Sequence, residues 1–235
     1  LVWQRLSRRS DTRYSVLILN RRGLELAQSA GVTYVEVYVS ASETHSLKNS
    51  GTSVAKALSG ACHLIEEALK NGIGVTAGVM CALGCFYEGP VSQETVKWLV
   101  SEFAQRGPAE IGLADTTGMG EPDSLKRMIE SLGRIVEAGR LSIHLHDTRG
   151  FGAANMEAAL DMGVRRFDAS IGGLGGCPFI PGAAGNIATE ATVARLHRLG
   201  YSTGINIEAL KRGREDLEKL LGRPLTSQDG MHHSS

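Results

Sequence analysis

Two histidines separated by one residue are the clearest candidates for chemistry in this sequence. His144 and His146 lie at the end of a short apolar run, residues 141–146, that has the composition of a β-strand. Side chains alternate between the two faces of a strand, so residues two apart project from the same face. The usual alternative, one core histidine and one surface histidine, conflicts with this spacing. Two unpaired imidazoles facing the interior would be costly to bury, and we therefore interpret the pair as metal ligands.

A glycine-rich segment, residues 170–186, is the second candidate. Its glycines and prolines exclude a helix or a strand interior, so we expect a loop that is either a tight connection or a backbone passing close to a bound molecule. The loop ends on Asn186, whose amide oxygen is a third candidate ligand. Imidazole and amide donors without a thiolate suit Mg²⁺, Mn²⁺ or another octahedral divalent metal better than structural zinc.

The same loop carries a thiol, Cys177, between Gly176 and Pro178. Exposed backbone N–H groups around it could lower its pKa or orient its proton. A small buried thiol without a chemical role is an equally good interpretation at this point.

Asp115 follows another apolar run, residues 109–114, and precedes Thr116-Thr117-Gly118. If the strands are parallel neighbours, its carboxylate could hydrogen-bond a ligand imidazole, bind the metal through water, or act as a base. A helix N-cap aspartate fits the local sequence nearly as well.

These residues are positioned by a regular alternation of strands and helices. We expect strands at 15–19, 33–40, 74–80, 109–114, 141–146 and 166–170. We expect the tail of a helix at 2–9, and helices at 21–30, 53–70, 93–105, from 122 onward, and at 150–162, 188–199 and 207–221. Asn20, Thr52 or Ser53, and Ser92 are suited to cap the helices that follow them. Such strict alternation predicts a parallel sheet covered by helices.

Two closures of that sheet are possible, a doubly wound open sheet and a (β/α)₈ TIM barrel. Polar candidates follow the carboxyl ends of several different strands: Asn20, Glu43, Glu88, Asp115, His144, His146 and the Cys177 loop. In a barrel these ends converge on one mouth, and no Gly-x-Gly-x-x-Gly follows the first strand. We predict a TIM barrel with about six of its eight βα units, as a single domain over residues 1–222, and a polar, disordered tail over residues 223–235.

Composition narrows the class of protein. The chain has 235 residues, 42% hydrophobic and 21% charged, and no net charge. Without a basic block, nucleic acid is not an expected partner, and no apolar run approaches the ~18 residues of a membrane helix. Four cysteines are too few for a disulfide scaffold. We interpret Cys81 and Cys85 as packing residues and expect a cytoplasmic location, with the mitochondrial matrix as the alternative. Because the chain starts at Leu1, we expect the native N-terminus to be missing.

Four motifs resemble the hydroxymethylglutaryl-CoA lyase family, metal-dependent carbon–carbon lyases related to Claisen-type synthases. They are Ala-Leu-Gly-Cys-Phe-Tyr-Glu-Gly (82–89), Leu-Ala-Asp-Thr-Thr-Gly (113–118), His-Leu-His-Asp-Thr (144–148), and Gly-Gly-Leu-Gly-Gly-Cys-Pro with Gly-Asn-Ile-Ala-Thr-Glu (172–190). The resemblance implies that His144, His146 and Asn186 bind the metal, Cys177 is the catalytic thiol, Asp115 is a catalytic polar residue, and Glu190 is a supporting carboxylate. It implies retro-Claisen cleavage of 3-hydroxy-3-methylglutaryl-CoA into acetyl-CoA and acetoacetate. We expect an acyl-CoA as substrate and a homodimer.

The sequence departs from the family pattern in one place. The first strand of the family carries an Arg-Asp pair, a metal ligand and an enolate-stabilising cation, and this chain begins after it. Arg8-Arg9-Ser10-Asp11 lies in a polar connector and is no substitute. We therefore expect the chain alone to be inactive and poorly soluble or oligomeric. The alternatives are a Claisen-type synthase, a 4-hydroxy-2-oxoacid aldolase, both disfavoured by the Gly-Gly-Cys-Pro loop, and a non-catalytic fragment.

Overall fold

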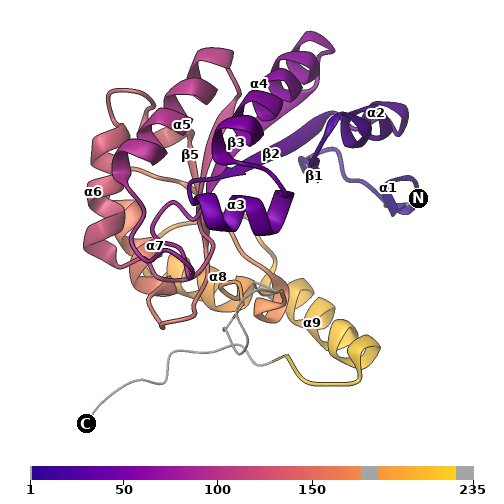
Figure 1. The fold of residues 1–235 in the computed structure, drawn as a ribbon. Helices are drawn as coiled ribbons and strands as arrows, with labels where there is room; N and C mark the ends of the chain where they lie inside the picture. Colours follow the sequence, from indigo (N-terminus) through magenta and orange to yellow (C-terminus); the bar gives the residue numbers. More distant parts are fainter. Residues whose placement is uncertain (1, 176–184, 226–235) are drawn as a thin grey trace.

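The computed structural model describes residues 2–175 and 185–225. Its strands form one parallel sheet in which each strand pairs with the next one along the chain (Figure 1). They are β1 (Val16–Leu17), β2 (Tyr34–Ser40), β3 (Gly74–Met80), β4 (Glu110–Asp115), β5 (Leu141–Leu145) and β6 (Arg166–Asp168). All six predicted strands are therefore present, in the sequential order of a barrel wall and without the reversal of strand order that a doubly wound sheet has.

Helices connect the strands and cover the outside of the sheet (Figure 1). In the described part of the chain they are α1 (Val2–Arg5), α2 (Arg21–Ser29), α3 (Glu43–Ser50), α4 (Val54–Lys70), α5 (Gln93–Arg106), α6 (Pro122–Leu132), α7 (Gly152–Asp161), α8 (Thr189–Arg198) and α9 (Ile207–Leu221). The predicted caps are confirmed, because the side chains of Asn20, Ser53 and Ser92 accept hydrogen bonds from the first turns of α2, α4 and α5. The helix α3 was not predicted.

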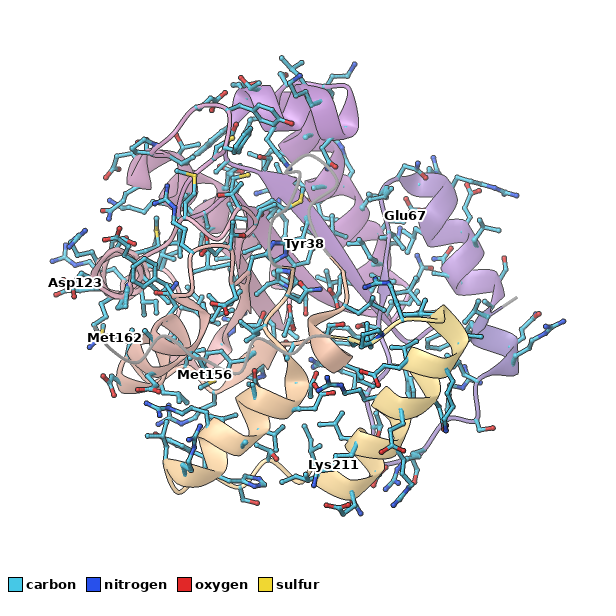
Figure 2. The ribbon with its side chains drawn as sticks, turned by 90° about the horizontal axis from the view of Figure 1, so that it is seen from below. Tyr38, Glu67, Asp123, Met156, Met162 and Lys211 are labelled. Atoms are coloured by element: carbon cyan, nitrogen blue, oxygen red, sulfur yellow. The ribbon has the colours of Figure 1, made fainter. Side chains whose placement is uncertain are left out.

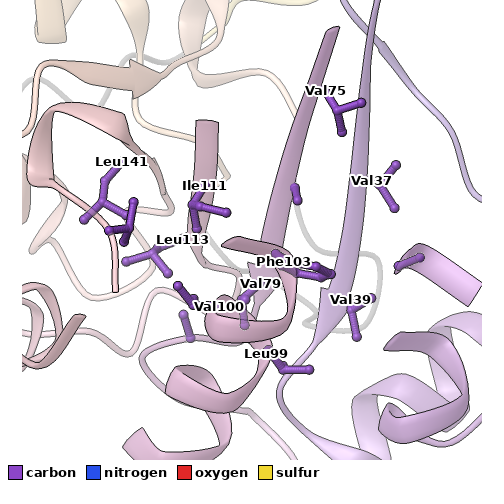
Figure 3. Packing of buried hydrophobic residues seen from close by; sticks show 14 of the residues in the cluster. Val37, Val39, Val75, Val79, Leu99, Val100, Phe103, Ile111, Leu113 and Leu141 are labelled. Atoms are coloured by element: carbon purple, nitrogen blue, oxygen red, sulfur yellow. The ribbon is translucent and has the colours of Figure 1, made fainter. Parts of the chain in front are cut away.

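The hydrophobic core lies between the sheet and this outer layer of helices. Alternate residues of β2 and β3, among them Val37, Val39, Val75 and Val79, are at most 3% exposed. Figure 3 shows them with buried side chains of α5, including Phe103. The side chains at these odd-numbered positions face the helices. The even-numbered side chains of both strands therefore lie on the inner face of the sheet.

The inner face carries one large side chain at its centre. Tyr38 of β2 pairs in register with Gly78 of β3, which pairs with Gly112 of β4. A Cβ atom at Gly78 would lie 2.1 Å from the Tyr38 ring, and one at Gly112 would lie 2.5 Å from its hydroxyl. The two glycines therefore leave the space that the Tyr38 side chain occupies beside β3 and β4. Figure 2 labels Tyr38 at the sheet.

The next inner layer toward the carboxyl ends of the strands contains the first candidate ligand. Register pairs Ala114 with His144 and His144 with Asp168. Asp115, one residue further along β4, pairs with Leu145 on the alternate, helix-facing set of positions. The strand register therefore places His144 and Asp168 together and separates Asp115 from that face.

The sheet is open between β1 and β6 in the described structure. A cavity of 840 Å³ lies along the inner face beside β6 and α8, and Tyr38, Glu110, Asp168 and Thr192 are among the residues that line it. Leu225, three residues beyond the predicted domain boundary, is only 3% exposed and lies against Gly172. None of the helices within residues 2–175 and 185–225 is long and apolar enough to cross a membrane.

Candidate metal centre and active site

Backbone pairing brings the end of the glycine-rich segment to the end of β5. The N–H of Asp147 donates to Gly185 O (3.1 Å), and the N–H of Ile187 donates to Leu145 O (3.2 Å). The N–H of Ser170, just after β6, donates to Ile187 O (3.1 Å). Residues 185–187 are thus attached to the ends of two strands, and Asn186 lies in an antiparallel bridge with His146.

The two histidines lie side by side, as their spacing predicted. Their ring centroids are 5.2 Å apart and the rings are tilted by 55°. His146 is buried and His144 is partly exposed. Burial, together with the neighbouring His144, lowers the pKa of His146 to about 4, although the Asn186 side chain opposes this shift. At neutral pH the His146 imidazole is therefore uncharged and offers a lone pair.

Two buried polar atoms at this point make no hydrogen bond of normal geometry, Nδ1 of His146 and Oδ1 of Asn186. The two side chains nevertheless lie close enough for the Asn186 amide to act on the pKa of His146. The amide orientation of Asn186 follows from its other end, since Nδ2 donates to Leu174 O (3.0 Å). Buried polar atoms normally have a hydrogen-bond partner. An imidazole nitrogen and an amide oxygen are electron-pair donors of the kinds that bind divalent cations. The residues present therefore fit a metal ion.

The amide oxygen is essential to this interpretation. Within the described ranges, no three His, Cys, Asp or Glu side chains gather closely enough to hold an ion by themselves. The donor set that the fold brings together is His144, His146 and Asn186, two imidazoles and one amide.

Asp115 is 1% exposed and is held by the loop that follows it. Its carboxylate accepts hydrogen bonds from the N–H groups of Met119 (3.1 Å) and Gly120 (3.1 Å). It is not the N-cap of α6, because Glu121 occupies that position. Burial raises the pKa of Asp115 to about 6, against the lowering effects of these N–H groups and of the nearby Arg149 and His144 charges. Asp115 therefore titrates close to neutral pH, within electrostatic reach of a candidate ligand.

The sequence interpretation missed Asp168, the last residue of β6. Its Oδ2 lies 3.4 Å from Nδ1 of His144. Burial raises the pKa of the Tyr38 hydroxyl, and the Asp168 carboxylate adds to that shift, which places Asp168 near the inner face as well. The signal available in the sequence was the position, a carboxylate at the end of the strand after the histidine strand.

Glu190 lies in the first turn of α8. Both of its carboxylate oxygens accept the N–H of Gly172, at 3.1 and 2.9 Å. Gly172 and Gly173 have φ values of +60° and +66°, a region that glycine adopts without strain. Glu190 therefore fixes the backbone of Gly172, near the start of the glycine-rich segment.

The other predicted positions divide into two groups. Cys177 lies outside the described residues. Three polar residues act as helix partners, because Asn20 caps α2, Glu43 accepts the N–H of Val54 (3.1 Å) and Glu88 accepts the N–H of Thr44 (2.6 Å).

Two other expectations concern packing and the N-terminal connector. Cys81 and Cys85 are buried free thiols, as a packing role requires. Arg9 and Asp11 form an exposed ion pair with each other at 2.7 Å.

Comparison with known proteins agrees with this arrangement. Residues 6–216 match the HMGL-like family model. The chain is 39% identical over 230 residues to the hydroxymethylglutaryl-CoA lyase of Pseudomonas mevalonii, covering 98% of this chain and 76% of that protein. The solved HMG-CoA lyase of Bacillus subtilis superposes with a TM-score of 0.93 at 36% identity, covering 97% of this chain and 76% of the other.

A second solved structure is an HMG-CoA lyase from Acinetobacter baumannii in complex with coenzyme A and 3-methylmalate. It superposes with a TM-score of 0.91 at 36% identity, covering 100% of this chain and 78% of the other. The predicted barrel architecture is confirmed by these superpositions. The chain belongs to the HMGL-like family, the family of the hydroxymethylglutaryl-CoA lyases, which are carbon–carbon lyases.

Proposed function

We propose that this chain carries the active site of a hydroxymethylglutaryl-CoA lyase, which cleaves 3-hydroxy-3-methylglutaryl-CoA into acetyl-CoA and acetoacetate. The observation that carries the proposal is the pair of buried donor atoms without a hydrogen bond of normal geometry, His146 Nδ1 and Asn186 Oδ1, beside His144. The identity to lyases over nearly the whole chain supports the reaction. The coenzyme A in a related lyase supports an acyl-CoA substrate.

His144, His146 and Asn186 would hold the metal, Mg²⁺ or Mn²⁺. A divalent cation bound there supplies Lewis acidity, which lowers the pKa of a coordinated substrate hydroxyl. The three ligands are uncharged, so they leave the positive charge of the ion available to the substrate.

Residues of the chain would carry out the proton transfers. Asp115, with its pKa raised to about 6, is mostly ionised at pH 7 and is our candidate to accept the proton of the tertiary hydroxyl. Loss of that proton forms the carbonyl of acetoacetate and breaks the bond to the acetyl-CoA carbon. Cys177 is our candidate to return a proton to that carbon. Glu190, which accepts the N–H of Gly172, is our candidate for a supporting carboxylate that holds the backbone of Gly172 rather than reacting.

We further propose that the enzyme works as a homodimer in the cytoplasm or the mitochondrial matrix. Named relatives occur in both compartments, which supports either location.

The metal assignment is tested on the full 235-residue chain by titrating Mn²⁺ and following the free ion by electron paramagnetic resonance. His146→Ala should abolish stoichiometric binding and any release of acetoacetate, while His63→Ala, an exposed histidine of α4, should change neither. Acetoacetate release that persists in excess chelator would contradict the metal assignment.

The role of Cys177 is tested in a version of the chain to which an Arg-Asp strand has been added, so that turnover can be measured and kcat separated from KM. Cys177→Ala should lose most of kcat, a factor of about 10²–10⁴ for a general-acid step, with little change in KM or in Mn²⁺ affinity. Cys62→Ala removes a thiol on α4 and serves as the control. An unchanged kcat would reduce Cys177 to a packing residue.

A further inference from the structure

We propose that Asp168 is a positioning residue that accepts the Nδ1 proton of His144 and thereby presents the Nε2 lone pair to the metal. This inference rests on the proposed function, because it takes His144 to be a ligand. It assigns a role to a residue outside the motifs by which the active site is identified.

The strand register supplies the first argument. His144 and Asp168 are direct partners across β5 and β6, on the inner-facing set of positions. Their side chains therefore leave the sheet in the same direction from adjacent strands. The resulting distance between Nδ1 and Oδ2 is 3.4 Å, slightly longer than the roughly 2.7–3.2 Å of an N–H···O hydrogen bond.

The second argument is that neighbouring carboxylates are engaged elsewhere. Asp115 accepts the N–H groups of Met119 and Gly120. Asp147, adjacent in sequence to His146, accepts the N–H of Gly152 at 2.7 Å and so fixes the start of α7. Asp168 differs from both because its close contact is with an imidazole nitrogen.

The third argument is chemical. A neutral imidazole exists as two tautomers, and the partner of one nitrogen decides which of them carries the proton. A carboxylate at Nδ1 selects the Nδ1–H tautomer and leaves Nε2 unprotonated, as in the carboxylate–histidine–metal arrangement of many metalloproteins. At His146, by contrast, Nδ1 makes no hydrogen bond of normal geometry, so the two histidines are oriented by different means.

The effect of removing Asp168 should be moderate. Its side chain is 49% exposed and that of His144 is 31% exposed, so water can replace part of the contact. Loss of such an outer partner typically lowers metal affinity by about 10–100-fold.

The experiment measures the tautomer of His144 directly in the metal-free 235-residue chain. Long-range ¹H–¹⁵N correlation spectra of histidine-labelled protein, assigned with His144→Gln, should show the Nδ1–H tautomer in the wild type and a mixture of tautomers in Asp168→Ala. Asp168→Asn retains an oxygen acceptor and should keep most of the Nδ1–H tautomer. Asp161→Ala removes an exposed aspartate that pairs with Lys126 at 3.1 Å, and it should leave the spectrum of His144 unchanged.

Mn²⁺ affinity provides the second readout. Asp168→Ala should bind Mn²⁺ about 10–100-fold more weakly, with Asp168→Asn between it and the wild type. If Asp168→Ala does not fold, Asp168→Asn is compared with the wild type instead and should still weaken Mn²⁺ binding.

Either of two results overturns the inference: an Nε2–H tautomer in the wild type, or a tautomer and Mn²⁺ affinity that no Asp168 variant changes. Failure of the wild type to bind Mn²⁺ while the tautomer responds to Asp168 would contradict the proposed function and leave the His144–Asp168 contact established.

Discussion

Asp115 is a residue that stabilises the fold and that we also propose as a proton acceptor. Its carboxylate ties the end of β4 to the loop before α6 through the N–H groups of Met119 and Gly120. The same burial that makes these hydrogen bonds possible removes water from the charge, and it raises the pKa of Asp115 to about 6 from its ordinary value of 3.8. A carboxyl group that titrates near neutral pH can take up a proton and release it again during a catalytic cycle.

This shift has a consequence for stability. Because the folded-state pKa lies above the unfolded value, the folded protein binds more protons between about pH 4 and pH 6. The contribution of Asp115 is therefore fully present below about pH 4 and is lost as the pH rises through about 6. A shift of this size corresponds to about 2–3 kcal/mol as an upper value. In Asp115→Asn the pH-dependent contribution should disappear, and the melting temperature relative to the wild type should rise between about pH 4 and pH 7.

The measurement is a series of thermal melts of both proteins over this pH range. Asp123→Asn, a substitution at the surface-facing start of α6, controls for the loss of one carboxylate. Parallel curves for the wild type and Asp115→Asn would contradict the assigned pKa.

The residues of the proposed metal site were predictable to different degrees. The i, i+2 spacing of His144 and His146 fixes a shared face whatever the tertiary structure. Asn186 was identified by its place in the chain, but its approach to His146 depends on backbone bonds to β5 and β6. Asp168 could not be selected beforehand, because only the strand register places it beside His144.

At the scale of the elements, local chemistry predicted most of the fold. Asn20, Ser53 and Ser92 have short polar side chains that cap helices, and each does so. The helix α3 was missed because its sequence, Glu43–Ser50, has little amphipathic pattern. It is held instead by the cap Ser42, the αL residue Gly51 and the carboxylate of Glu88. Strand ends also moved, as β6 stops at Asp168 where the pairing with β5 ends.

The central strands make a specific prediction about Gly78. A Cβ atom there would lie 2.1 Å from the ring of Tyr38, a half-buried side chain that also lies close to Gly112 of the next strand. Gly78→Ala should destabilise the protein by about 1–3 kcal/mol through overpacking, measured by urea denaturation. Gly60 lies within α4, and a Cβ atom added there would have no neighbour within 4 Å, so Gly60→Ala should stabilise by up to about 1 kcal/mol. Equal effects of the two substitutions would show that Tyr38 moves freely and does not fill the inner face.

At the scale of the whole molecule, an ion-pair network on the inner face joins distant parts of the chain. Glu110 at the start of β4 has a side chain that is only 7% exposed, and it pairs with Arg13 at 2.7 Å and with Arg166 at 3.1 Å. The Arg13 guanidinium also lies 4.2 Å from the centre of the Tyr34 ring. The N-terminal connector and β6 are thereby both attached to β4, at the opposite end of the strands from the proposed metal site.

Removing the Glu110 carboxylate should therefore lower the free energy of unfolding of the whole protein rather than loosen one element. Glu110→Gln keeps the size of the side chain but replaces two charge-assisted contacts, each worth about 1.5–3 kcal/mol. Arg13 and Arg166 are 52% and 45% exposed, so water should recover part of this energy, and we expect a net loss of about 2–3 kcal/mol. For a chain of this size each kcal/mol lowers the melting temperature by about 2–4 °C.

Glu94→Gln is the matched control, because Glu94 forms a surface pair with Lys97 at 2.9 Å and its side chain is 79% exposed. Exposed pairs contribute about 0–1 kcal/mol, so the melting temperature of this variant should fall by much less. The difference between the variants should persist in about 1 M salt, since a buried carboxylate is screened less than an exposed one. If both variants have the melting temperature of the wild type, the ion pairs of Glu110 do not contribute to stability. The open sheet would then be stabilised by the apolar layer between the strands and the outer helices alone.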